Sequence, residues 1–224
     1  MHFYKIIFVL LIMFTNSKLF SYEEGIALNG DLEIYYRDYG PKDAEPILLV
    51  QGIGGQLINW PEHLIDFLLE NNFRPIVYDN RDTGLSSRIP SDSFSDAKRD
   101  NTIVKNYIRY YLRLPIKSDY TLDDMAVDGV SVLDKLDISE AHILGVSMGG
   151  MIAQIIVSSH PERTKTFTLI SSTASTPSPF NGPTRKVRKL LMDRTKNPNS
   201  TIDERVARSR KIFTEIGYQG IDLN

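Results

Sequence analysis

The stretch AHILGVSMGGMIAQIIVSS, residues 141–159, decides the fold. Its first six residues form a short apolar run, which predicts a buried strand. From Met148 onward, apolar side chains recur at three- and four-residue spacings, which predicts a helix to about residue 159. Between the strand and the helix lies the pattern G-x-S-x-G, formed by Gly145, Ser147 and Gly149.

The two glycines flank a turn that is too tight for a Cβ at either position. Such a turn lifts Ser147 Oγ clear of the backbone, and the helix N-terminus adds free N–H groups and a positive dipole. At the Gly and Ser content of this chain, the pattern arises by chance about 0.07 times per chain. We interpret residues 145–149 as a nucleophile elbow with Ser147 as the nucleophile; the alternative is a glycine-rich packing turn.

Apolar runs and helical patterns alternate along the chain from residue 46 to residue 172. Residues 25–39 alternate apolar and polar side chains about Asn29-Gly30, the strongest short hairpin signal, and we place these two residues in the turn. We expect an α/β fold, a mostly parallel sheet that starts with an antiparallel hairpin and is covered by helices. The predicted strands are 46–50, 75–79, 141–146 and 167–170, and the predicted helices are 60–69, 121–136 and 148–159. Thr121 and Asp124 predict a capping box at the start of the second helix.

A second glycine-rich loop, Gln51-Gly52-Ile53-Gly54-Gly55, follows the strand at 46–50. Ligands of an open α/β sheet bind at the carboxyl ends of the strands, so this loop should lie near the elbow. Acyl transfer builds negative charge on a carbonyl oxygen, which two backbone N–H groups can stabilise. Those of Ile53 and Met148 are the expected oxyanion donors. A dinucleotide site is excluded because the third glycine of that fingerprint is missing.

The composition is that of an ordinary globular protein, with 42% hydrophobic residues and a net charge of -2. That charge gives no general attraction to nucleic acid. The chain has no Cys and four His, so we expect no disulfide, no thiolate metal site and no other metal centre.

The N-terminus has the layout of a secretory signal peptide. Lys5 precedes nine apolar residues, 6–14, and a small residue stands at Ser21. We expect residues 1–21 to be cleaved and the protein to be exported, to the periplasm or the medium, with only transient membrane contact. A signal anchor that is left uncut and a buried first strand are the alternatives.

Five motifs in register resemble the α/β-hydrolase superfamily, closest to the branch of aclacinomycin methylesterase-like hydrolases. The resemblance covers residues 23–176 and rests on LLVQGIGG (48–55), YDNRDTGLS (78–86), YTLDDMA (120–126), GVSMGGMIAQ (145–154) and HPER (160–163). It implies a serine hydrolase that cleaves small-molecule carboxylic esters, such as methyl esters, through a Ser147 acyl-enzyme without a cofactor. Gln51 departs from the His usual in the superfamily at this loop, but that His is not the catalytic one.

The resemblance also implies a base and an acid on later strands, which we do not find. His160 lies 13 residues after Ser147, about 20 Å along a helix. His142 lies at the wrong end of its strand, His63 belongs to the first helix and His2 to the signal segment. We count six of the family's eight strands. The expected organisation is a signal peptide (1–21), the N-terminal part of a hydrolase domain (22–176) and the start of a helical lid (177–224).

Three explanations for the missing groups stay open. The chain is a catalytically dead remnant left by a frameshift or a split gene, half of an enzyme that a second polypeptide completes, or a binding module without hydrolytic activity. The basic stretch 184–211 suggests a nucleic-acid or membrane patch, but its apolar residues and balancing acids favour an amphipathic lid helix. By any of these readings, the chain alone should have little esterase activity.

Overall fold

The computed structural model describes residues 21–90, 118–173 and 201–216, with residues 105, 106, 108, 109, 112, 114, 184–187 and 189. The chain divides into two compact units, Met1–Ala174 and Ser175–Asn224. The predicted signal peptide lies outside the described residues except for Ser21, as does most of the predicted lid. In the second unit, α7 (Ile202–Ile216) is a helix. No helix within the described ranges has both the length and the apolar character that crossing a bilayer requires.

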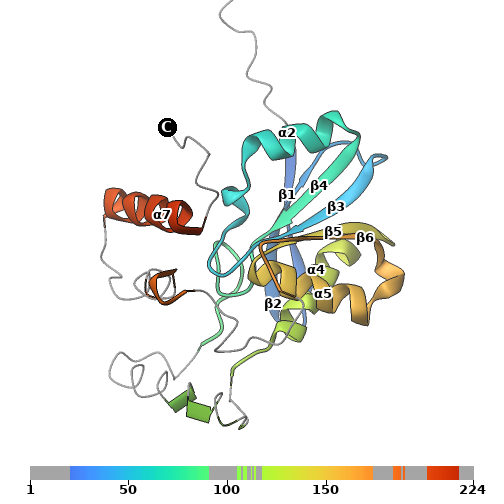
Figure 1. Cartoon of the computed structure of the whole chain (residues 1–224). Coiled ribbons are helices and arrows are strands. Elements are labelled where there is room, and N and C mark those ends of the chain that lie inside the picture. The colour runs from blue at the N-terminus through green and yellow to red at the C-terminus, as the bar shows by residue number, and fades with distance from the viewer. Residues whose placement is uncertain are drawn as a thin grey trace, which may run out of the picture. The chain divides into compact units, whose positions relative to one another are not determined.

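The first unit is built on one mixed sheet of six strands (Figure 1). Their order across the sheet is β1-β2-β4-β3-β5-β6. Strands β3, β4, β5 and β6 run parallel, while β2 pairs antiparallel with both β1 and β4. The predicted fold class is confirmed. The strands are β1 (Tyr22–Asn29), β2 (Leu32–Tyr39), β3 (Glu45–Val50), β4 (Phe73–Tyr78), β5 (Ala141–Val146) and β6 (Thr164–Ile170).

The N-terminal hairpin turns one residue later than predicted. Asn29 pairs with Leu32, so the two loop residues are Gly30 and Asp31, and of these only Gly30 has a positive φ, 60°. A positive φ at the first loop position alone is typical of a type II′ turn, which needs glycine there. The Asn29 side chain is used elsewhere, because its Nδ2 donates to Asp128 Oδ1 at 2.8 Å.

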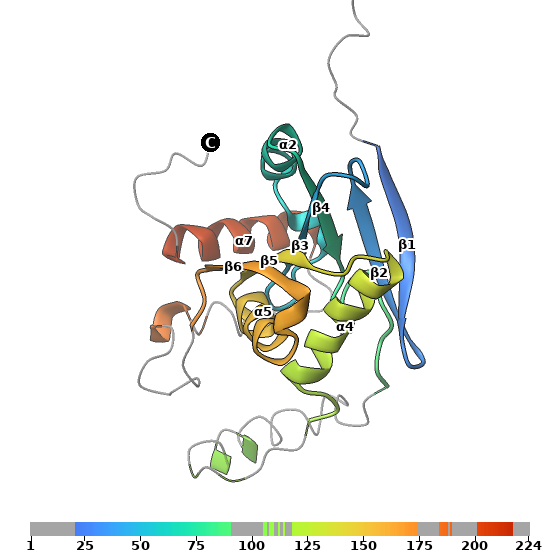
Figure 2. The same ribbon diagram turned by 90° about the vertical axis from the view of Figure 1, so that its right-hand side faces the viewer.

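Helices cover both faces of the sheet (Figure 2). One face carries α2 (Glu62–Glu70), which follows a short 3-10 turn, Leu57–Asn59. The other carries α4 (Leu122–Lys135) and α5 (Met148–Ser159), the latter followed by a 3-10 turn, Pro161–Arg163. Apolar strand residues therefore enter two cores, as the continuous apolar runs require. The residues below 2% exposure include Ile34, Leu48, Leu49, Val50, Ile76, Val77, Leu133, Ile143, Ile152 and Ile156.

The predicted capping box starts α4. Thr121 is the N-cap residue, and Asp124 N donates to its Oγ1 at 3.3 Å. Asp124 Oδ2 accepts from Thr121 N at 2.7 Å in return. Thr121 Oγ1 also donates to Asp124 Oδ2, at 2.8 Å. The two hydrogen bonds to the carboxylate, from the backbone and then the side chain of Thr121, hold the pKa of the Asp124 carboxyl below its ordinary value.

Candidate active site

Ser147 occupies a strained turn between β5 and α5. Its φ is 55° and its ψ is -122°, a conformation that residues with a Cβ rarely adopt. Its N–H donates to the carbonyl of Ile170, the last residue of β6, at 2.9 Å. The residue is exposed, so the turn presents a hydroxyl at the carboxyl edge of the sheet.

The glycines beside Ser147 allow strand and helix to approach closely. A Cβ on Gly145 would stand 2.3 Å from the carbonyl oxygen of Gly149. A Cβ on Gly149 would stand 2.1 Å from the carbonyl oxygen of Val50, at the end of β3. The first residues of α5 are thus packed against two strand ends, which fixes the position of Ser147 between them.

The loop after β3 lies against the elbow. A Cβ on Gly52 would stand 3.1 Å from Ser147 Cβ and 3.5 Å from its Oγ. Ile53 follows with its side chain 68% exposed, and Gly54 adopts a positive φ of 63°. Gln51 is buried, and its Oε1 accepts from Gly52 N at 3.3 Å. The structure brings the two glycine-rich motifs together, while the roles of Ile53 and Met148 as oxyanion donors stay predictions.

A third loop, after β4, enters the same edge and was not assigned a role from the sequence. Asp79, Asn80 and Arg81 are at most 5% exposed. Arg81 pairs with Asp128 of α4 through Nε and Nη2, at 2.6 and 2.7 Å. The sequence signal for this loop was a family motif, which says nothing about what the side chains contact.

Comparison with known proteins identifies the family to which the chain belongs. The family described as "alpha/beta hydrolase fold" matches residues 45–213, well over half of the chain. The chain belongs to the α/β-hydrolase family.

Several of the similar curated proteins are named as hydrolases. Rhodomycin D methylesterase DnrP of Streptomyces peucetius is 30% identical over 158 residues, which cover 70% of this chain and 41% of that protein. The putative carbamate hydrolase RutD of Variovorax paradoxus is 27% identical over 141 residues, 63% of this chain and 43% of that protein. This α/β-hydrolase thus spans less than half the length of these relatives.

Solved structures show the same fold. A 2-hydroxy-6-oxo-6-phenylhexa-2,4-dienoate hydrolase from Rhodococcus sp. strain RHA1 superposes with a TM-score of 0.60 at 19% identity. The match covers 87% of this chain and 58% of that one. A carboxylesterase structure from the thaumarchaeon Nitrososphaera gargenis gives a TM-score of 0.59 at 19% identity, over 90% of this chain and 61% of that one.

The described histidines of this α/β-hydrolase lie away from Ser147 or make no bond to it. His142 is at the amino end of β5, with its Nδ1 2.7 Å from Thr166 Oγ1. His160 follows the far end of α5, and His63 is exposed on α2. Within the described part of the chain, no hydrogen bond joins Ser147 to a histidine. A base for Ser147 is therefore not found among these residues.

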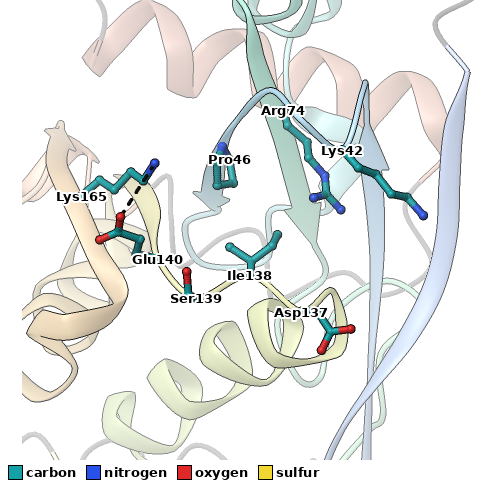
Figure 3. A pocket seen from close by; sticks show the side chains of 8 residues that line it. All are labelled: Lys42, Pro46, Arg74, Asp137, Ile138, Ser139, Glu140 and Lys165. Atoms are coloured by element: carbon teal, nitrogen blue, oxygen red, sulfur yellow. Dashed lines mark ion pairs between the residues drawn. The ribbon is translucent and has the colours of Figure 1, made fainter.

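A hollow of about 220 Å³ lies at the opposite end of the strands (Figure 3). Its walls include Pro46 at the start of β3, Arg74 near the start of β4 and Lys165 near the start of β6. Its cations form ion pairs: Arg74 with Asp38 at 2.6 Å, Lys42 with Glu23 at 3.2 Å, and Lys165 with Glu45 and Glu140. Figure 3 shows the pair of Lys165 and Glu140. Within the described ranges, no cluster of three or more His, Cys, Asp or Glu could hold a metal ion.

Proposed function

We propose that the chain is a serine hydrolase that cleaves carboxylic esters, methyl esters among them. Ser147 Oγ attacks the ester carbonyl and the alcohol leaves with the proton, which forms an acyl-enzyme. Water then attacks the acyl carbon and releases the acid and the free serine. The amides of Ile53 and Met148 stabilise the oxyanion of each tetrahedral intermediate.

The observation that carries this proposal is the strained, exposed Ser147 beside the glycine loop. Strain at one serine, held by close backbone contacts on both sides, is a feature that packing alone does not require. The methylesterase and carbamate hydrolase relatives support hydrolysis of a carbonyl group flanked by oxygen or nitrogen.

We further propose that the base and the acid lie on strands that extend the sheet beyond β6. No other described strand pairs with the far edge of β6. Along this strand, Phe167, Leu169 and Ile170 are 38%, 36% and 41% exposed, although β6 lies in a parallel array that is normally covered. A strand added in parallel there would end at the same edge as Ser147, where a histidine on it could take the serine proton.

The test is hydrolysis of p-nitrophenyl acetate above the buffer background. We expect a small residual enhancement from the chain alone, because oxyanion stabilisation and binding alone leave up to about 10³-fold over water. The readout specific to the nucleophile is the acetyl-enzyme: p-nitrophenyl acetate should acetylate Ser147. Ser147→Ala should abolish this acetylation, whereas Ser158→Ala, at an exposed serine of the same helix, should not. Acetylation that survives Ser147→Ala at the level of the parent contradicts the nucleophile. Turnover at the rate of ordinary esterases by the chain alone contradicts a base that lies on strands beyond β6.

A further inference from the structure

The loop after β4 holds the loop after β3 at both of its ends. At the start of the β3 loop, Asn80 Nδ2 donates to the carbonyl of Gln51 at 3.1 Å. At its end, Leu57 N donates to Asp79 Oδ1 at 2.8 Å. Both holding side chains are almost fully buried, with exposures of 3% for Asp79 and 2% for Asn80. The five residues between these two points include Ile53.

The carboxylate of Asp79 is built into its own loop as well. Its Oδ2 accepts from Leu85 N at 2.9 Å, so each oxygen binds one backbone N–H. Gly84, with a φ of 55°, closes around it, and a Cβ at this position would stand 1.9 Å from Asp79 Oδ2. The loop after β4, residues 79–87, therefore keeps this conformation only with a glycine at position 84 and two acceptor oxygens at position 79.

The loop after β4 is itself hydrogen-bonded to the sheet and to α4. Ser86 Oγ donates to the carbonyl of Asp79 at 2.6 Å and accepts from Tyr35 N of β2 at 2.9 Å. Arg81 binds Asp128 of α4 in a buried, two-bond ion pair. The β3 loop is thus held by groups that belong to the rigid part of the fold.

We propose that Asp79 and Asn80 are positioning residues for the oxyanion amide of Ile53; this inference rests on the proposed function. The Gln51 carbonyl that Asn80 binds belongs to the peptide that carries Gly52 N, and Gly52 packs against Ser147. Rotation of that peptide turns the next one, and with it the N–H of Ile53. Oxyanion donors act through preorganisation, so freedom in this loop lowers the rate of the chemical step rather than substrate binding.

The first experiment removes the hydrogen bond from Asn80 to the Gln51 carbonyl in the full chain and measures amide hydrogen exchange. Asn80→Ala removes the donor, and Asn80→Asp keeps the size but turns a carboxylate toward the carbonyl. We expect amides of residues 52–57 to exchange at least about tenfold faster, with β5 and α4 unchanged. Asn71→Ala is the matched control, because Asn71 Nδ2 also donates to a backbone carbonyl, that of Phe67, at 2.8 Å, but away from this loop.

The second experiment weakens the hydrogen bond at the other end of the β3 loop, from Leu57 N to Asp79. Asp79→Asn keeps the shape, but the amide has one acceptor oxygen, so its NH₂ must face the N–H of Leu57 or of Leu85. Exchange in residues 52–57 should again rise about tenfold. Asp82→Asn in the same loop is the control: its bond from a backbone N–H, that of Ile89 at 2.7 Å, can be kept by the amide oxygen.

Different results would contradict the positioning role of Asp79 and Asn80 and the serine hydrolase mechanism. Exchange in 52–57 that is unchanged in the Asn80 and Asp79 variants overturns the positioning role, whatever the activity. Faster exchange in these variants, together with acetylation that survives Ser147→Ala, supports the positioning role but refutes the serine nucleophile. In hydrolysis of p-nitrophenyl acetate, Asn80→Ala should lower kcat at least about tenfold at unchanged KM. A loss confined to KM would also overturn the positioning role.

Discussion

Replacement of Ser147 by glycine should stabilise the protein relative to replacement by alanine. With φ at 55° and ψ at -122°, any residue with a Cβ is strained at this position. Such conformations cost about 1–3 kcal/mol, and glycine escapes this cost because it has no Cβ. Alanine retains the strain while it removes the hydroxyl, so the two variants differ in backbone strain and not in chemistry.

The expected size follows from two opposing effects. Relief of strain contributes about 2 kcal/mol in favour of glycine. The greater freedom of glycine in the unfolded chain offsets this by about 0.4–1 kcal/mol. The free energy of unfolding of Ser147→Gly should therefore exceed that of Ser147→Ala by about 1 kcal/mol.

Ser131 gives a matched pair with the opposite sign. It lies inside α4, and its Oγ donates to the carbonyl of Asp128 at 2.7 Å, a bond that alanine and glycine lose alike. In a helix interior, alanine should be the more stable by about 1 kcal/mol. Urea unfolding, followed through the fluorescence of the single tryptophan, the buried Trp60, measures all four variants. If alanine is the more stable variant at both serines, the argument for a strained elbow is refuted.

Three further predictions concern stability. Gly149→Ala should lose about 2 kcal/mol in urea unfolding, because its Cβ would stand 2.1 Å from a backbone carbonyl of Val50; unchanged stability would show that α5 can shift. Asp128→Asn should lose about 3 kcal/mol by the same measurement, since it leaves the buried Arg81 without a counter-charge; a loss below about 1 kcal/mol would show that the pair is not a net contributor. The pKa of Asp124 is held below its ordinary 3.8, so its contribution is present above about pH 4 and is lost as the pH falls through the lowered value. Urea unfolding of Asp124→Asn should accordingly lose less stability than the parent between pH 5 and about pH 3; equal losses contradict this.

The sheet could be predicted because each strand and helix depends on local pattern. The apolar runs at β3, β4 and β5 lie in both cores, and the helical spacing of α4 and α5 matches the observed elements. The hairpin was placed correctly, but its turn was not. A dipeptide signal cannot show that the Asn29 side chain is engaged by Asp128, 99 residues away, while Gly30 alone supplies the positive φ.

The candidate site could be predicted only where a motif carries its own geometry. Gly145, Ser147 and Gly149 mark the elbow, because a tight strand-to-helix turn selects those residue types. The partners of Asn80 and Asp79 could not be found in this way. Their contacts join loops that are 29 and 22 residues apart, and hydrogen bonds between loops leave no periodic trace in a sequence.

The carbonyl of Gln51 shows why one unusual residue in the glycine loop need not disturb the site. This oxygen receives the hydrogen bond from Asn80 and lies close to α5, since a Cβ on Gly149 would stand 2.6 Å from it. The elbow helix, the β4 loop and the proposed oxyanion loop therefore meet at one main-chain group. A main-chain carbonyl is present whatever side chain the residue carries, so glutamine in place of the family's histidine leaves this junction intact. The junction instead restricts the residue types that contact this carbonyl: position 149 must lack a Cβ, and position 80 must donate a hydrogen bond.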